Sequence, residues 1–327
     1  MKHLRGLIPA FAGVLLGACS INPPLDLSEI VAGGTPPLAS NIPFYPQTEF
    51  QCGPAALAGL LGAAGVETGP DILSPQIYLP QRQGSLQVEL LAATRRAGRV
   101  AYVIEDDPRV LIAQIEAGRP VLVLQNLLTR HFPNWHYAVL VGFDASRNRV
   151  HLNSGTEQGL EMKAAKFLRT WDWGGRWAMV ALRPGELPAM AQAQSYAAAV
   201  ADFEAVAGFA AAAPAWQAAV ERWPLDSHPH LALGNQAYAR GDLADAVTHY
   251  RRGLALDSEN PALRNNLASV LGELGCARSG EAVLGVARDG RANDAHWQSL
   301  LAQTRAELAA RQGQDPASCA APVDGPR

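Results

Sequence analysis

The sequence predicts two consecutive domains, an α+β domain followed by an all-α domain of helical repeats. The chain has 327 residues, which favours two domains of about 150 residues each over a single one. Up to about Arg183, candidate helices precede short apolar strands, an order typical of α+β domains. After Pro184 and Pro188 the sequence becomes alanine-rich and follows a helical period.

The first 18 residues are expected to be a signal peptide. Lys2 and Arg5 make its start basic, residues 7–16 form an apolar run too short to span a bilayer comfortably, and Leu16-Gly17-Ala18-Cys19 follows. This pattern resembles a bacterial lipoprotein signal, which implies cleavage before Cys19 and acylation of that cysteine. The alternative is an ordinary secretory signal with an incidental cysteine. Ser20, where an aspartate would imply inner-membrane retention, favours by resemblance an outer-membrane anchor facing the periplasm.

The α+β domain is placed at residues 42–185, behind a tether of residues 19–41 that contains several prolines and glycines. Three helices are predicted from apolar periodicity and from cap residues, over residues 55–64, 86–97 and 107–116. Three strands are predicted from short apolar runs, over residues 121–124, 135–143 and 149–153. A turn through residues 144–148 joins the last two strands.

Residues 190–312 are predicted to form tetratricopeptide-like helical repeats, followed by a flexible tail at residues 313–327. Small residues such as Gly234 and large ones such as Tyr250 recur close to the 34-residue spacing of that repeat. A second copy starts at Pro261, and an eroded unit precedes the first. The alternative is a generic antiparallel helical bundle.

Charge and cysteine content narrow the function. The net charge of −3 and the absence of a Lys/Arg block give no reason to expect a nucleic-acid partner. The histidines of the second domain match no metal-site spacing, and we expect no cofactor. With Cys19 carrying lipid and Cys52 kept reduced, Cys276 and Cys319 are the candidates for a disulfide in an oxidising periplasm.

Cys52 is the candidate nucleophile because it stands at the start of a predicted helix. The helix dipole and the unpaired amides of the first turn favour a thiolate, and the same amides can hold an oxyanion. A glutamine side chain upstream would complete the oxyanion hole. We favour Gln47 over Gln51, since a residue adjacent to the nucleophile tends to point elsewhere. The alternative is that Cys52 is a small buried hydrophobic residue.

His136, at the start of a predicted strand, is the candidate base, and Asn153 is the candidate group that orients it. A turn centred between Asp144 and Ala145 would place His136 directly opposite Asn153, with the Cβ atoms about 5 Å apart. Asp144 lies at the far end of the His136 strand and is interpreted as a turn residue. His151 is the alternative base, and His131 lies in a loop from which it could touch substrate.

Four segments together resemble the C39 and C39-like cysteine peptidases of the papain-like superfamily. They are residues 43–47, 52–58, 118–123 and 136–144. The resemblance covers roughly residues 42–183 and implies that Cys52 is the nucleophile, His136 the base and Gln47 the oxyanion donor. The chain departs from the family pattern by placing Asn153 where an aspartate is usual and Gln47 one residue nearer the cysteine.

These observations predict a lipid-anchored periplasmic cysteine peptidase that hydrolyses peptide bonds by a Cys-His-Asn mechanism. The helical repeats would dock a peptide or protein substrate, or an envelope protein partner. One alternative is a catalytically inactive papain-like scaffold whose repeats bind envelope proteins. Another is acyl transfer or a different amide hydrolysis, because a thiolate with an imidazole does not distinguish between amide donors.

Overall fold

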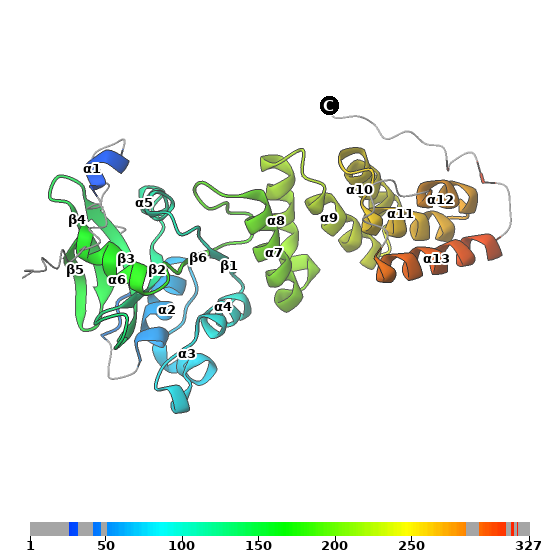
Figure 1. Cartoon of the computed structure of the whole chain (residues 1–327). Helices are drawn as coiled ribbons and strands as arrows, with labels where there is room; N and C mark the ends of the chain where they lie inside the picture. Colours follow the sequence, from blue (N-terminus) through cyan, green and yellow to red (C-terminus); the bar gives the residue numbers. More distant parts are fainter. Residues whose placement is uncertain are drawn as a thin grey trace, which may run out of the picture.

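The computed structural model of the chain describes residues 26–31, 42–46, 51–285, 294–311, 315–316 and 319. It confirms the predicted fold class, since an α+β part is followed by an array of helices (Figure 1). Cys19, Gln47 and the predicted signal peptide lie outside the described residues. Within the described residues, no helix is both long and apolar enough to cross a membrane.

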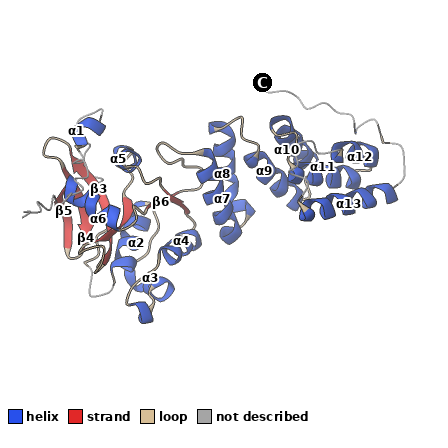
Figure 2. Ribbon diagram, in the orientation of Figure 1, coloured by secondary structure: helices blue, strands red, loops and turns tan. Residues whose placement is uncertain are grey.

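A six-stranded sheet forms the centre of the α+β part, with every neighbouring pair antiparallel in the order β1-β6-β2-β3-β4-β5 (Figure 2). The strands are β1 (Val100–Val103), β2 (Val121–Asn126), β3 (Trp135–Asp144), β4 (Arg149–Ser154), β5 (Glu157–Lys163) and β6 (Ala178–Leu182). The strands predicted at β2, β3 and β4 are confirmed. Strands β1, β5 and β6 were not predicted.

Helices cover both faces of this sheet. They are α2 (Cys52–Ala63), α3 (Pro70–Ile77), the short 3-10 helix η1 (Pro80–Arg82), α4 (Gln87–Arg96), α5 (Pro108–Glu116) and α6 (Ala164–Trp173). One core holds α2, α3 and α4 against the sheet, and the opposite face packs with α5 and α6. The three predicted helices are confirmed as α2, α4 and α5, and the Asp107 carboxylate caps α5 by accepting from the Arg109 amide. Ser85, which stands directly before the predicted helix 86–97, does not cap α4, because the helix begins at Gln87 with Leu86 as its N-cap residue.

The predicted register of the β3–β4 hairpin is wrong. Asn153 lies opposite Val139, and His136 lies opposite Gln125 of β2. The turn is centred between Ser146 and Arg147 and not between Asp144 and Ala145, because Asp144 pairs with Arg149. The register shifts again at a bulge between Leu140 and Gly142. Because side chains alternate between faces, such a shift changes which residues can meet across the hairpin.

Part of the predicted tether is packed onto the domain. Residues 27–30 form helix α1 (Leu27–Ile30), which the Asp26 carboxylate caps by accepting from the Ser28 amide. Leu27 is fully buried in the core, and its amide donates to Asn148 Oδ1. The buried Leu27 therefore fixes this part of the predicted tether beside the β3–β4 turn.

The second part is an array of paired helices. They are α7 (Ala193–Ala207), α8 (Phe209–Arg222), α9 (His228–Ala239), α10 (Leu243–Leu256), α11 (Pro261–Glu273), α12 (Ala277–Leu284) and α13 (Ala295–Ala310). Glycines allow neighbouring helices to approach closely, as the repeat pattern predicted. A Cβ at Gly234 would stand 2.4 Å from the Tyr250 ring, and one at Gly253 would stand 2.8 Å from Leu263.

The sheet and the helical array share one apolar core. Helix α7 packs on β1, where the Tyr102 and Tyr196 rings lie 6.5 Å apart, and Trp223 lies 5.5 Å beyond Tyr196. An ion pair of 2.6 Å joins Arg95 of α4 to Asp202 of α7. The two parts are therefore continuous in packing, and no exposed linker separates them.

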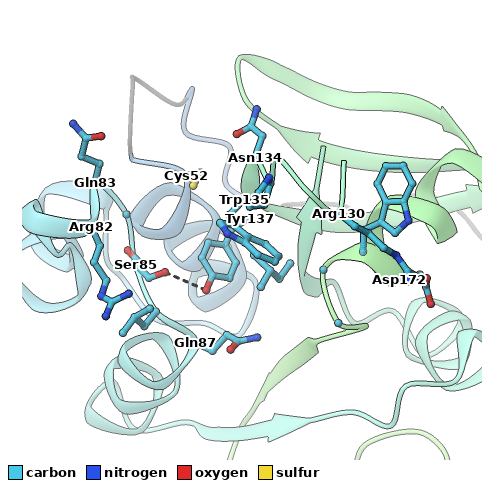
Figure 3. A pocket seen from close by; sticks show the side chains of 17 residues that line it. Cys52, Arg82, Gln83, Ser85, Gln87, Arg130, Asn134, Trp135, Tyr137 and Asp172 are labelled. Atoms are coloured by element: carbon cyan, nitrogen blue, oxygen red, sulfur yellow. Dashed lines mark hydrogen bonds and ion pairs between the residues drawn. The ribbon is translucent and has the colours of Figure 1, made fainter. Parts of the chain in front are cut away.

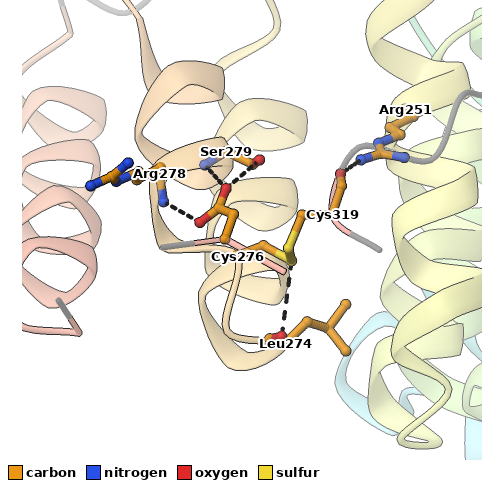
Figure 4. The surroundings of a disulfide bond; sticks show 7 residues. Arg251, Leu274, Cys276, Arg278, Ser279 and Cys319 are labelled. Carbon is orange, nitrogen blue, oxygen red and sulfur yellow. Dashed lines mark hydrogen bonds between the residues drawn. A yellow bond between two sulfur atoms is a disulfide. The ribbon is translucent and has the colours of Figure 1, made fainter. Parts of the chain in front are cut away.

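The end of the chain is fastened back onto the array. Cys276 and Cys319 form the candidate disulfide, and Arg251 of α10 donates to the Cys319 carbonyl (Figure 4). Asp315 accepts from the backbone amides of Arg278 and Ser279 at the start of α12. These contacts tie a segment beyond α13 to helices much earlier in the sequence.

Two histidines meet inside the α9–α10 pair. His230 Nδ1 and His249 Nδ1 are 3.2 Å apart, and His230 is buried. Burial lowers the pKa of His230 to about 4 and lowers that of His249 as well. Asp226, Asp245, Arg240 and Arg252 are the charged groups around them. Since only one of the facing nitrogens can donate, the pair is stable with at least one neutral imidazole.

We expect Cys276→Ser to lower the free energy of unfolding by about 4 kcal/mol, because the disulfide closes a long loop. The bridge joins residues 43 positions apart. Denaturant unfolding of the full chain measures the change. Wild-type protein in reducing agent should match the variant, and a variant as stable as the oxidised wild type would show that the bridge adds nothing.

We expect the stability of the array to fall as the pH drops below about 6.5, the usual pKa of an unfolded histidine. The folded pKa values of His230 and His249 are depressed, so protons bind the unfolded chain preferentially. Stability is therefore complete above that pH and is lost progressively toward pH 4. Thermal unfolding against pH tests this, and His249→Leu should flatten the dependence.

Candidate active site

Cys52 is the first residue of α2 and is partly exposed. It is the single free cysteine among the described residues, and no described group hydrogen-bonds its sulfur. Gln51 occupies the N-cap position without a side-chain cap, so the first-turn amides are available to an anion. The thiol therefore stands where a helix terminus can stabilise negative charge.

A cavity of about 870 Å³ opens in front of Cys52 (Figure 3). Three segments far apart in the sequence form its walls. Residues 82–87 lie on one side, Leu124 and the start of β3 on another, and residues 172–175 at the end of α6 close the third. The cavity has the size of a ligand-binding cleft.

Tight packing fixes the surroundings of the thiol. A Cβ at Gly53 would stand 2.5 Å from Ser85 Oγ, so only glycine fits directly after Cys52. Tyr137 Oη donates to the Ser85 carbonyl at 3.3 Å, which links β3 to the segment before α4. Burial, together with the nearby Cys52, raises the pKa of Tyr137, so this hydroxyl keeps its proton. The end of α6 also lies close to β2, because a Cβ at Gly174 would collide with the Leu124 carbonyl.

His136 is the second residue of β3 and is partly buried. Its Nε2 lies 2.8 Å from Ser154 Oγ, the last residue of β4, and burial lowers its pKa. No hydrogen bond between described atoms joins it to Cys52. Because side chains alternate between the two faces of a strand, His136 lies on the same face of β3 as Ala138 and Leu140, opposite α2. It does not line the cavity.

Asn153 does not contact His136. Its Oδ1 accepts from the Gly159 amide at 3.0 Å and so fastens the β4–β5 hairpin. The hydrogen bond predicted between Asn153 and the imidazole is therefore absent, and the His136 ring is bonded to Ser154 instead. The corrected register explains the exchange, since neighbouring residues of β4 face opposite sides of the sheet.

The remaining candidates are dispersed. Asp144 accepts from the Ser146 hydroxyl and the Arg147 amide, as a turn residue does. His151, the alternative base, lies opposite Gly142 in the hairpin. His131 is exposed in the β2–β3 loop.

The β2–β3 loop beside the cavity is held by groups that the sequence analysis missed. Asn126, buried at the end of β2, accepts from the amides of Leu128 and Asn134 and donates to the Thr129 carbonyl. Arg130 pairs with Asp172 at 2.6 Å, which ties the loop to α6. The sequence signal for this arrangement is Asn126, an amide residue at the end of an apolar strand.

Comparison with known families supports both parts of the fold. Residues 39–178 match the family described as Peptidase_C39 like, and residues 234–275 match the TPR repeat. The chain thus carries a C39-like peptidase domain followed by tetratricopeptide repeats. Among curated proteins, none is significantly similar to this chain.

Solved structures resemble each part separately. A proposed C39-like peptidase from Bacillus anthracis is 18% identical over 44% of this chain and 96% of its own, with a TM-score of 0.38. A double glycine motif protease from an AMS/PCAT transporter, bound to its leader peptide, is 21% identical over 46% and 95%, with a TM-score of 0.35. The Yersinia enterocolitica secretion chaperone SycD with a YopD peptide is 22% identical over 36% and 90%, with a TM-score of 0.33.

We expect Ser154→Ala to lower the pKa of His136, because the imidazolium loses the acceptor of its Nε2–H. Asn153→Ala, which removes a contact to the β4–β5 hairpin, should leave that pKa in place. NMR titration of the His136 ring in the full chain measures both. The assignment of Ser154 fails if Asn153→Ala moves the His136 titration and Ser154→Ala does not.

Proposed function

We propose that this protein is a cysteine peptidase that hydrolyses peptide bonds in the bacterial periplasm. The observation that carries the proposal is the position of Cys52. A partly exposed thiol stands at the N-terminus of a buried helix and opens into a large cleft. The surrounding residues match a C39-like peptidase family. A helix terminus, a thiol and a cleft are the parts that nucleophilic attack on a carbonyl requires.

In the proposed reaction, the Cys52 thiolate attacks the scissile carbonyl, and His136 takes the thiol proton and later protonates the leaving amine. Nε2 of His136 is engaged by Ser154, which leaves Nδ1 as the basic nitrogen. The Cys52 amide and the Gln47 side chain hold the oxyanion. Asn153 contributes indirectly by fixing the hairpin that carries Ser154. The mechanism requires the His136 side chain to leave the sheet face that it shares with Ala138 and Leu140 and to reach the sulfur when substrate fills the cleft, since catalytic contacts often form only in the complex.

The proposed location is the outer membrane, with a lipid on Cys19 as the anchor and the domains facing the periplasm. The disulfide between Cys276 and Cys319 supports an oxidising compartment, because such bonds are rare in the cytosol. The buried Leu27 brings the chain onto the domain a few residues after the proposed anchor.

The repeats are proposed to dock the substrate or an envelope protein partner. A second cavity of about 450 Å³ supports this, with Tyr238, Asn235 and Asn266 among its lining residues. Amide side chains can pair with a peptide backbone, while exposed Phe209 supplies apolar contact at the same cavity.

A second candidate is a catalytically inactive scaffold whose repeats bind envelope proteins. The specific observation in its favour is that His136 is bonded to Ser154 and has no hydrogen bond to Cys52. In that case the C39-like domain would serve as a rigid base for the array.

Thiol reactivity separates the two candidates. We expect iodoacetamide to label Cys52 roughly tenfold faster than it labels glutathione at pH 7, because the uncapped first-turn amides of α2 stabilise the thiolate. Cys52→Ala should abolish labelling, and His136→Ala should reduce the rate far more than His151→Ala. Labelling at the rate of glutathione would support the scaffold, and a larger effect of His151→Ala would transfer the role of base to that residue.

A further inference from the structure

The mixed polar and apolar lining of the cleft in front of Cys52 includes two large apolar side chains that are exposed. Trp135 is 55% exposed and Leu86 is 39% exposed, and both line the cavity. Trp135 shares the α2 face of β3 with Tyr137, so its ring lies beside the mouth of the thiol site (Figure 3). Leu86 belongs to the wall formed by residues 82–87.

The apolar surface continues from the cleft onto the β2–β3 loop. Leu128 and Phe132 of this loop are 57% and 75% exposed. The loop is not loose, because Asn126 makes three hydrogen bonds to it and Arg130 is paired with Asp172. A rigid, exposed apolar rim is costly in water and is typical of a surface that receives a ligand.

The charges around the cleft favour an anionic group on that ligand. Arg82 lines the cavity, is exposed and has no ion pair or side-chain hydrogen bond among the described residues. The one carboxylate of the lining, Asp172, is already neutralised by Arg130 and Arg176. The cleft therefore offers Arg82 as a cation without an ion partner, a positive excess around Asp172, and no unpaired anion, which complements a carboxylate.

We propose that the substrate is a peptide segment with a bulky apolar side chain next to the scissile bond and a carboxylate that reaches Arg82. This inference rests on the proposed peptidase function and names its substrate class. The apolar side chain contacts Trp135, Leu86 and Leu124, which all line the cavity of about 870 Å³. Gly175 adds to the space, because a Cβ there would meet no atom within 4 Å.

A panel of fluorogenic octapeptides tests the proposal on the full chain. The central residue is Phe, Leu, Gly or Lys, and a flanking position is Glu, Gln or Lys. We expect kcat/KM for Phe or Leu to exceed that for Gly by at least about tenfold, and Glu to exceed Lys by roughly fivefold. Equal rates across the panel would overturn the proposal while leaving the peptidase function intact.

Variants assign the two preferences to their residues. Trp135→Ala should remove most of the preference for Phe over Gly, and Arg82→Glu should reverse the preference between Glu and Lys. Leu225→Ala and Arg305→Glu are the matched controls, since both residues are exposed and lie in the helical array. Preferences that survive Trp135→Ala and Arg82→Glu unchanged would contradict the inference.

Binding separates a failure of the substrate class from a failure of catalysis. If the wild type cleaves no peptide, fluorescence anisotropy with the Cys52→Ala chain reports affinity directly. Tighter binding of the Phe/Glu peptide than of the Gly/Lys peptide supports the substrate class even without turnover, and equal or absent binding overturns it. The inference also fails if Phe132→Ala and Trp135→Ala abolish binding to phosphatidylglycerol vesicles without changing any peptide preference, because the rim would then be a membrane contact.

Discussion

The burial of α2 against β2 and β3 is the interaction on which the thiol site depends. Leu57, Leu60 and Leu61 are almost fully buried, and each contributes roughly 1.5–3 kcal/mol relative to an exposed side chain. Gly59 and Gly62 let Pro43 pack directly on the helix, since a Cβ at either position would collide with it. The location of Cys52 thus follows from apolar packing along the helix behind it.

The same packing explains which elements the sequence revealed. Helix α2 and strand β2 are continuous apolar runs, and α5 begins with an Asp-Pro pair that caps it, so each carries a strong local signal. Strand β5 carries no such signal. It has only two apolar residues, Leu160 and Met162, lies at the edge of the sheet and is mostly exposed, so its pairing with β4 is what makes it a strand.

The sequence predicted two residues of the candidate site, Cys52 and His136, but it did not predict the partner with which His136 forms a hydrogen bond. Cys52 and His136 were found from their positions at the start of elements, which depend on nearby residues. The partner of His136 depends on the hairpin register, and a bulge near Gly142 together with a turn centred later in the sequence replaced Asn153 by Ser154. Because side chains alternate with a period of two, an error of one residue exchanges partners completely. The role of Asn126 was not predicted, because it depends on hydrogen bonds to the amides of Leu128 and Asn134 that form only when the β2–β3 loop folds.

The core that joins Tyr102 to Tyr196 and Trp223 has a consequence for any polypeptide that touches both parts of the molecule. The shared core restricts rotation of the helical array against the sheet. The second cavity, which Tyr238 lines, therefore stays at a constant separation from Cys52. A polypeptide bound at both places would have to span this constant distance. Under the proposed peptidase function, this separation would set the number of residues between the docking sequence and the cleavage point of a substrate.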